Sequence, residues 1–189
     1  MTQTLPSYLK HHFLIAMPHM EDPRFAHSLI YLCEHNAEGA MGLVINRPSG
    51  LNLGDVLEQT SPEISVPQDV GGRTVFNGGP VQSERGFVLH RGSQRWESSL
   101  DLGPLQLTTS RDILVDMTRG HGPRESFVAL GYAGWEAGQL EQELVDNVWL
   151  SCPADYAILF ELQAEQRLDA AGRSLGIDIN LLTSQAGHA

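Results

Sequence analysis

Two apolar segments joined by a short polar turn, within residues 28–48, constrain the fold more than any other part of this sequence. Residues 29–35 are rich in bulky and aromatic side chains, as β-strands are. In residues 41–45, Met41, Leu43 and Ile45 alternate with Gly42 and Val44, a period of two. Gly39 lies in the connection, where hairpin loops favour a residue that accepts positive φ. The stretch therefore predicts a β-hairpin with a four-residue loop, residues 36–39.

The only thiol inside a clear strand, Cys33, lies in this hairpin. The four-residue loop places Gly42 opposite Cys33 and puts His35 on the same face of the sheet. Gly42 then leaves space over the sulfur; a bulge or a close backbone contact is the other interpretation of that glycine. Since a reactive thiol needs a nearby base or cation, Cys33 and His35 are the candidate catalytic residues. A buried, inert cysteine is the alternative.

The rest of the chain mixes hairpins with strand–helix–strand passages. A break in the sheet is expected at residues 47–50, followed by a helix over 53–59 that Asn52 caps. The further elements expected are strands over 13–17, 74–76, 86–91, 126–132 and 148–152 and helices over 111–120, 138–147, 154–160 and 162–175. This order predicts an α/β (mixed α+β) fold, with a mixed β-sheet and several α-helices packed against it. We expect one domain over residues 1–189, with residues 1–12 and 181–189 loose.

Charge and composition restrict the function classes. The 189 residues carry a formal net charge of −11, which argues against direct binding of nucleic acid. Lys10 is the only lysine, against eleven arginines, which indicates either anion recognition by guanidinium groups or biased codon usage. No apolar run is long enough to cross a bilayer, and no signal peptide is recognisable at the start, so we expect a cytoplasmic protein without membrane contact.

Motifs for cofactors and metals are weak. The eight histidines and two cysteines show no metal-ligand spacing, so we assign no metal and no cofactor. Two glycine pairs, in 71–73 and 78–80, lack the lysine and helix start of a phosphate-binding loop. The carboxylates of Glu141, Glu143 and Asp146 are interpreted as a solvated helix face rather than an acid–base site.

Turns at strand ends expose the groups that are better suited to binding than to catalysis. An arginine beside aromatic rings and glycines is typical of a small-molecule or peptide pocket. The candidate ligand-binding residues are Asn46, Arg47, Gly78, Gly79, Arg85, His90, Tyr132 and Trp135.

Five ordered blocks, spread over nearly the whole chain, resemble the YqgE/AlgH family of bacterial proteins. They are FLIAMP (13–18), SLIYLCEHNAEGAMGLVINRP (28–48), FNGGPV (76–81), RGFVLH (85–90) and ALGYAGWEAGQLEQELVDNVW (129–149). The resemblance implies a cytoplasmic, single-domain α/β fold. It also implies a regulatory role, through the link of one family name to alginate gene regulation, but it brings no established reaction or catalytic residue.

Three functions follow as hypotheses. The first is a non-enzymatic protein that binds an unidentified small molecule or protein partner and regulates gene expression indirectly. The second is a thiol enzyme or redox sensor that uses Cys33. The third, direct nucleic-acid binding, is disfavoured by the acidic charge.

Overall fold

The computed structural model describes residues 8–186, with side chains through residue 182, and confirms the mixed α/β class. The strands are β1 (His12–Ala16), β2 (Leu29–Asn36), β3 (Gly39–Val44), β4 (Pro48–Asn52), β5 (Thr74–Asn77), β6 (Val81–His90), β7 (Ser99–Asp101), β8 (Gln106–Thr108), β9 (Ser126–Glu136) and β10 (Trp149–Pro153). The helices are α1 (Leu53–Thr60), α2 (Gln68–Gly71), α3 (Asp112–Thr118), α4 (Gln139–Val145), α5 (Tyr156–Phe160), α6 (Ala164–Ser174) and α7 (Ile179–Ala186).

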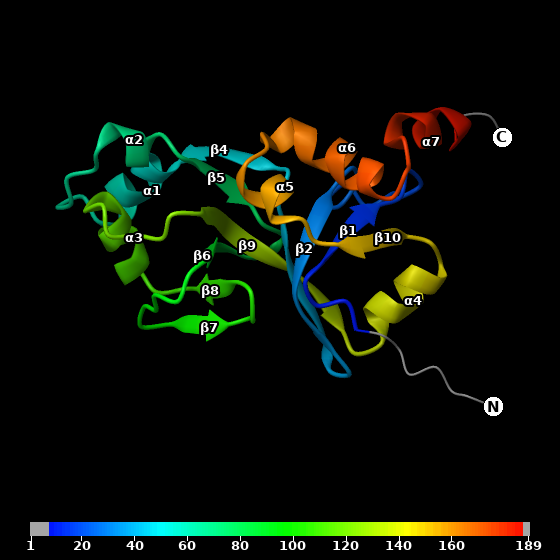
Figure 1. Ribbon diagram of the computed structural model, residues 1–189, viewed down its shortest axis with the longest axis horizontal. Coiled ribbons are helices and arrows are strands. Elements are labelled where there is room, and N and C mark those ends of the chain that lie inside the picture. The colour runs from blue at the N-terminus through cyan, green and yellow to red at the C-terminus, as the bar shows by residue number, and fades with distance from the viewer. Residues whose placement is uncertain (1–7, 187–189) are drawn as a thin grey trace.

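One ten-stranded sheet runs through the described residues, in the order β10-β1-β2-β3-β9-β6-β8-β7, with β5 also on β9 and β4 beyond β5. All of its pairings are antiparallel except that of β5 with β9. The long strand β9 pairs with β3 through residues 133–136 and with β5 through residues 128–130. It therefore connects the two halves of the molecule (Figure 1).

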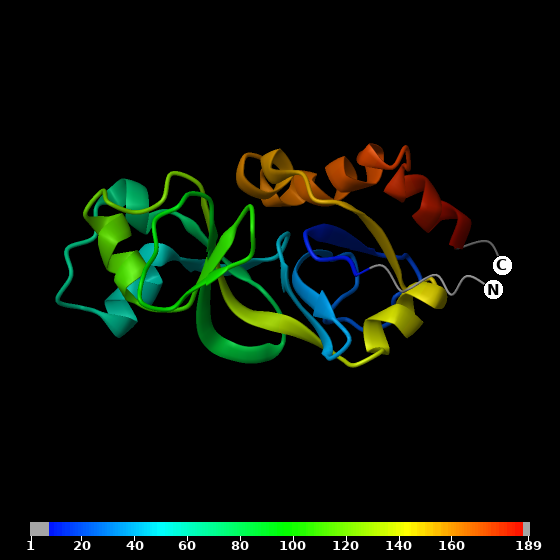
Figure 2. The ribbon, with the colours of Figure 1, turned by 60° about the horizontal axis from the view of Figure 1, so that its bottom comes forward.

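Helices cover different faces of these two halves (Figures 1 and 2). Around β1–β3 and β10, helices α5 and α6 cover one face over a cluster that includes Tyr31 and Cys33. On the opposite face α4 covers a second cluster, which includes Trp135 and Trp149. In the other half, α1 and α3 contribute to a third cluster, which includes Leu57. We call these the α6-side, α4-side and α1-side clusters.

The tip of the β2–β3 hairpin is tighter than predicted. His35 lies opposite Ala40 as expected, but Asn36 also pairs with Gly39, so only residues 37–38 form the turn. Gly39 has a φ of +142°, a conformation that a residue with a Cβ rarely adopts. The loop is therefore two residues long, and the prediction of four is wrong.

A β-bulge at Cys33 shifts the rest of the hairpin by one residue, so that Gly42 lies opposite Leu32. A Cβ at Gly42 would come within 2.6 Å of the Ile30 side chain, which leaves no free space there. Because the bulge also reverses the alternation, His35 faces α4 whereas Cys33 packs in the α6-side cluster. The expectation that Cys33 and His35 share a face is wrong.

The sheet continues where a break was expected. Pro48 begins β4 and lies opposite Phe76 of β5. This strand is at the edge of the sheet, where the missing N–H of proline leaves no ladder bond unmade. The predicted cap of α1 is confirmed, because the Asn52 side chain accepts a hydrogen bond from the Asp55 amide at 2.8 Å.

Regular structure and hydrogen bonds extend into both predicted loose ends within the described residues. At the C-terminal end, where a loose tail is expected after residue 180, α7 extends to Ala186. Near the start, the Leu9 amide donates to His35 Nδ1 at 2.9 Å and β1 begins at His12. The other parts of the two predicted loose ends, residues 1–7 and 187–189, lie outside the described residues. None of the helices described is both long and apolar enough to span a membrane.

Candidate ligand-binding site

The polar atoms of Arg47 and Asn46 hold the turn at residues 22–27 in place. The Arg47 guanidinium donates to three backbone carbonyls, those of Pro23, Arg24 and Ala26. The Asn46 side chain accepts from the Leu29 amide at 2.9 Å and donates to the His27 carbonyl at 2.9 Å. These two predicted binding residues therefore use their polar groups within the fold.

Gly78 and Gly79 allow two backbone segments to cross closely. Gly79 has a φ of +152°, and a Cβ there would lie 2.1 Å from the carbonyl carbon of Tyr132. A Cβ at Gly78 would lie 2.4 Å from the carbonyl oxygen of Gly131. Gly79 also shares a small pocket of about 160 Å³ with Arg47. The close crossing with β9 therefore requires that Gly78 and Gly79 have no side chain.

Three predicted residues, Arg85, Tyr132 and Trp135, do come together. They line an open hollow of about 690 Å³ formed by β3, β6 and β9. The Arg85 guanidinium lies 5.5 Å from the centre of the Phe87 ring, which meets the Tyr132 ring edge-on at 5.7 Å. Trp135 is only 7% exposed, so it presents little more than an edge to this surface. Arg47 and Gly79 line a different pocket, so the candidate residues do not share one rim.

His90 lies apart from all of these residues, inside the other half of the molecule. It is fully buried, its Nε2 lies 2.8 Å from the Thr108 hydroxyl, and its ring packs edge-on against Trp96. Burial lowers the pKa of the His90 imidazole, which keeps the ring neutral near pH 7. This histidine therefore supports the core around β6 and β8.

The surroundings of the two catalytic candidates do not favour chemistry. Cys33 is 1% exposed, and burial raises the pKa of its thiol, which opposes the thiolate that a nucleophile requires. His35 accepts the Leu9 amide at Nδ1, so its Nε2 carries the proton and donates to Glu141 at 2.6 Å. Both ring nitrogens of His35 are therefore engaged, and neither is available as a base.

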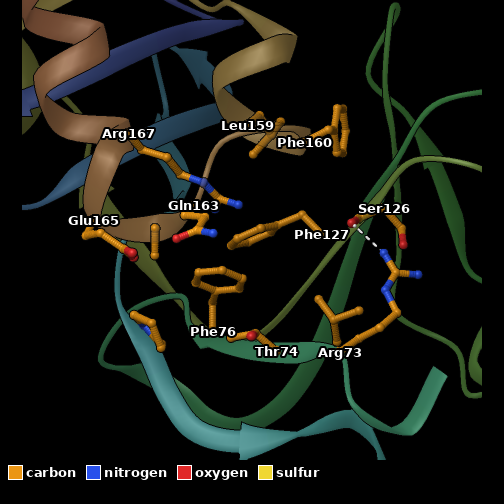
Figure 3. A pocket seen from close by; sticks show the side chains of 13 residues that line it. Arg73, Thr74, Phe76, Ser126, Phe127, Leu159, Phe160, Gln163, Glu165 and Arg167 are labelled. Atoms are coloured by element: carbon orange, nitrogen blue, oxygen red, sulfur yellow. Dashed lines mark hydrogen bonds between the residues drawn. The ribbon is translucent and has the colours of Figure 1, made fainter. Parts of the chain in front are cut away.

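A cavity that the sequence analysis did not identify lies where α5 and α6 meet the β4, β5 and β9 strands (Figure 3). Its volume is about 470 Å³, within the usual range of small-molecule sites. The residues that line it are Pro48, Arg73, Thr74, Phe76, Ser126, Phe127, Val128, Leu159, Phe160, Gln163, Ala164, Glu165 and Arg167. We call it the arginine cavity.

Arg167 forms one side of the arginine cavity, although only 6% of the residue is exposed. Its Nε donates to the Leu162 carbonyl at 3.0 Å, and its Nη1 donates to the Ile45 carbonyl. The guanidinium lies 4.8 Å from the centre of the Phe76 ring and 5.7 Å from that of Phe127. These contacts fix the orientation of the positive group.

Arg73 stands across the cavity from Arg167, with the rings of Phe76 and Phe127 between them (Figure 3). Its Nη2 donates to the Ser126 carbonyl at 3.0 Å. The two rings lie 4.6 Å apart and are tilted by 30°, so they form an apolar floor. The Ser126 hydroxyl is buried and has no hydrogen-bond partner among the described residues.

Neither cavity arginine takes part in any of the six ion pairs found within residues 8–186. Burial lowers the pKa of both guanidinium groups, that of Arg167 to about 10. Glu165, at the cavity rim, raises the pKa of Arg167 again but forms no ion pair with it. Since a buried charge without a counter-ion is costly, the arginine cavity is suited to receive an anion.

The sequence contained only indirect signals for this cavity. The excess of arginine over lysine indicates anion recognition as one interpretation, and Arg73 follows a glycine pair that lacks the lysine and helix start of a phosphate-binding loop. Nothing local marks Arg167, because its partners Ile45 and Phe76 lie far away in the chain. The site depends on the packing of α6 against the sheet, which no short motif encodes.

These features define a mixed α/β protein whose sheet and C-terminal helices enclose a basic cavity with an aromatic floor. A family model described as AlgH-like matches residues 13–180, so the chain belongs to the AlgH-like family, as the resemblance predicted. It is 61% identical to a UPF0301 protein of Stutzerimonas stutzeri and 60% identical to the UPF0301 protein AlgH of Pseudomonas aeruginosa, in both cases over the full length of both chains.

Two solved structures resemble this fold. The solution structure of the AlgH protein from Pseudomonas aeruginosa is similar with a TM-score of 0.82 at 60% identity, and the match covers all of both chains. A crystal structure of a Corynebacterium diphtheriae protein is similar with a TM-score of 0.72 at 20% identity, covering 97% of this chain and 94% of that one. The second likeness concerns the fold alone.

Proposed function

We propose that this protein is a non-enzymatic binding protein that takes an anionic small molecule, or an anionic group of a protein partner, in the arginine cavity. The observation that carries the proposal is the pair Arg73 and Arg167, which lie on opposite sides of an apolar floor and form no ion pair with any described carboxylate. In a chain with a net charge of −11, two such groups in one cavity favour a small anion over a large polyanion.

The alternatives receive less support from the geometry. A thiol enzyme or sensor based on Cys33 needs an accessible thiolate, and burial of this thiol opposes one. A base at His35 would need a free ring nitrogen, and both are engaged. Among the described residues, no group of three or more His, Cys, Asp or Glu side chains could hold a metal ion.

The cellular role that we propose is indirect regulation in the cytoplasm, carried out by a single domain. The name of the AlgH relative, with which this chain shares 60% identity, suggests a role in alginate gene expression. The continuous sheet through both halves supports the single domain, since β9 pairs in each of them. Binding of an anionic ligand would then change the interaction of this protein with a partner protein. The hollow at Arg85 and Tyr132 is the second binding position that we propose, and it suits a partner chain because it is open.

Thermal-shift measurements with a panel of anionic and neutral metabolites test the proposal. Two substitutions, Gln163→Glu and Glu165→Gln, change the charge of the cavity rim at exposed side chains that make no hydrogen bond to another described residue. We expect anionic compounds to stabilise the wild-type protein, Gln163→Glu to weaken this effect and Glu165→Gln to strengthen it. Glu58→Gln, on the exposed side of α1, is the matched control and should behave as the wild type.

The binding proposal fails if no anionic compound stabilises the wild type, or if all three variants respond alike. The position of the site is tested separately by Arg85→Ala. Loss of ligand response in Arg85→Ala, with the cavity variants unaffected, would move the site to the hollow. Binding-dependent turnover of any panel compound would contradict the non-enzymatic assignment.

A further inference from the structure

The first turn of α6 forms part of the cavity rim. Gln163 at the N-cap makes no capping hydrogen bond, and Gln163, Ala164 and Glu165 all line the cavity. The first amides of a helix have no acceptor within the helix, and the helix dipole adds partial positive charge at this end. An eleven-residue helix thus presents its uncapped N-terminus to the same space as Arg167.

Arg167 is an independent sign of a ligand at this end of the cavity. It is only 6% exposed, yet its charge has no carboxylate partner among the residues that the structure describes. Within the described part of the chain its hydrogen bonds use Nε and Nη1, so Nη2 has no acceptor there and can donate to a ligand. A fixed guanidinium beside free helix amides is a suitable arrangement for a tetrahedral oxyanion, which accepts from several directions at once.

The remainder of the cavity suits a flat ring. The Phe76 and Phe127 rings form its floor, and ring stacking on aromatic side chains tolerates many ring types. Beyond the floor lies the Arg73 guanidinium, which can bond the polar edge of such a ring. The cavity is therefore positive at one end, apolar in the middle and polar at the other end (Figure 3).

We infer that the arginine cavity binds a phosphomonoester of a flat ring compound, of the size of a nucleoside monophosphate. The phosphate lies at the α6 N-terminus and Arg167, the ring lies over Phe76 and Phe127, and its polar edge faces Arg73. This inference rests on the proposed function and narrows its ligand. A benzoate-like carboxylate has two oxygens in one plane and leaves the helix amides or the guanidinium unsatisfied.

Isothermal titration with four probes tests the inference, namely adenosine monophosphate, adenosine, inorganic phosphate and benzoate. We expect adenosine monophosphate to bind roughly tenfold or more tightly than each of the other three, because only it fills both ends of the cavity. Gln163→Glu should weaken its binding about fivefold to tenfold and Glu165→Gln should tighten it about threefold, from the change of one rim charge. Glu58→Gln should leave the affinity unchanged. Backbone NMR spectra verify that each variant is folded.

The outcomes separate this inference from the proposed function. Benzoate binding as tightly as adenosine monophosphate, with the same response to the rim variants, overturns the phosphate and leaves the anion cavity in place. Adenosine binding as tightly as its monophosphate also overturns the inference. If none of the probes binds while other panel anions stabilise the protein through the cavity, the ligand class is wrong and the function stands. If the effect of every anionic compound is the same in the rim variants as in the wild type, both the inference and the proposed function are wrong.

Discussion

Replacing Arg167 by methionine tests whether this buried cation is integral to the fold. The substitution removes the donors to the Ile45 and Leu162 carbonyls and the contact with the Phe76 ring. Each carbonyl left unbonded costs roughly 1–3 kcal/mol, and the lost cation–ring contact about 1 kcal/mol. Removing a charge from a buried position offsets part of this cost. We therefore expect the free energy of unfolding to fall by about 2–4 kcal/mol.

Urea denaturation followed by far-ultraviolet circular dichroism measures this change. The matched control is Arg173→Met, which makes the same substitution at an exposed residue in the last turn of the same helix. That variant should lose only about 0.3–1 kcal/mol, the usual contribution of a cation near a helix C-terminus. Equal stability of Arg167→Met and Arg173→Met would contradict this expectation, since the hydrogen bonds of the Arg167 guanidinium would then contribute nothing.

Three further predictions concern other parts of the molecule. Gly131→Ala should lower the free energy of unfolding by about 3 kcal/mol or more, because the new Cβ would lie 2.3 Å from the Gly79 carbonyl oxygen. In the control Gly86→Ala the new Cβ meets no atom within 4 Å, so the free energy of unfolding should change little in the same urea assay. Because burial raises the pKa of the Cys33 thiol, peptide mapping should find this residue unmodified by iodoacetamide at pH 8 in the native protein and modified in urea. Rapid labelling of Cys33 in the native protein would instead support a thiol enzyme or redox sensor. Burial also raises the pKa of the Glu143 carboxyl in the folded protein above its unfolded value of about 4.3. Protonation of Glu143 therefore stabilises the fold at pH values below about 4.3, and this stabilisation is lost as the pH rises through the folded pKa. Glu143→Gln should therefore melt at a higher temperature than wild type at pH 7 and show little difference at pH 4, and equal melting temperatures at both pH values would contradict this.

Local signals predicted much of the secondary structure. The periodicity of residues 29–45 indicated the hairpin, and the Asn52 cap marked the start of α1, because both depend on neighbouring residues alone. The bulge at Cys33 could not be predicted in this way. It depends on how β2 fits between β1 and β3, a tertiary constraint that overrides simple alternation. Pro48 misled the prediction because its effect depends on whether the strand lies at an edge.

The candidate site was harder to predict than the fold. Turn residues such as Arg47 and Gly79 resemble binding groups in the sequence. In the structure Arg47 donates hydrogen bonds to backbone carbonyls, and Gly79 allows two chain segments to cross closely. The arginine cavity combines β5, β9 and α6, whose residues are separated by up to about one hundred positions, and the sequence gives no register between them. A buried arginine on a helix is indistinguishable by pattern from an exposed one, such as Arg173.

The most direct test of the anion site is a heteronuclear NMR titration of the wild-type protein with adenosine monophosphate, with the arginine Nε–H signals observed. We expect the signals of Arg73, of Arg167 and of the amides of residues 163–167 to shift together and to saturate with one affinity. Shifts confined to Arg85 and the β6–β9 hollow, with the two cavity arginines unchanged, would contradict it.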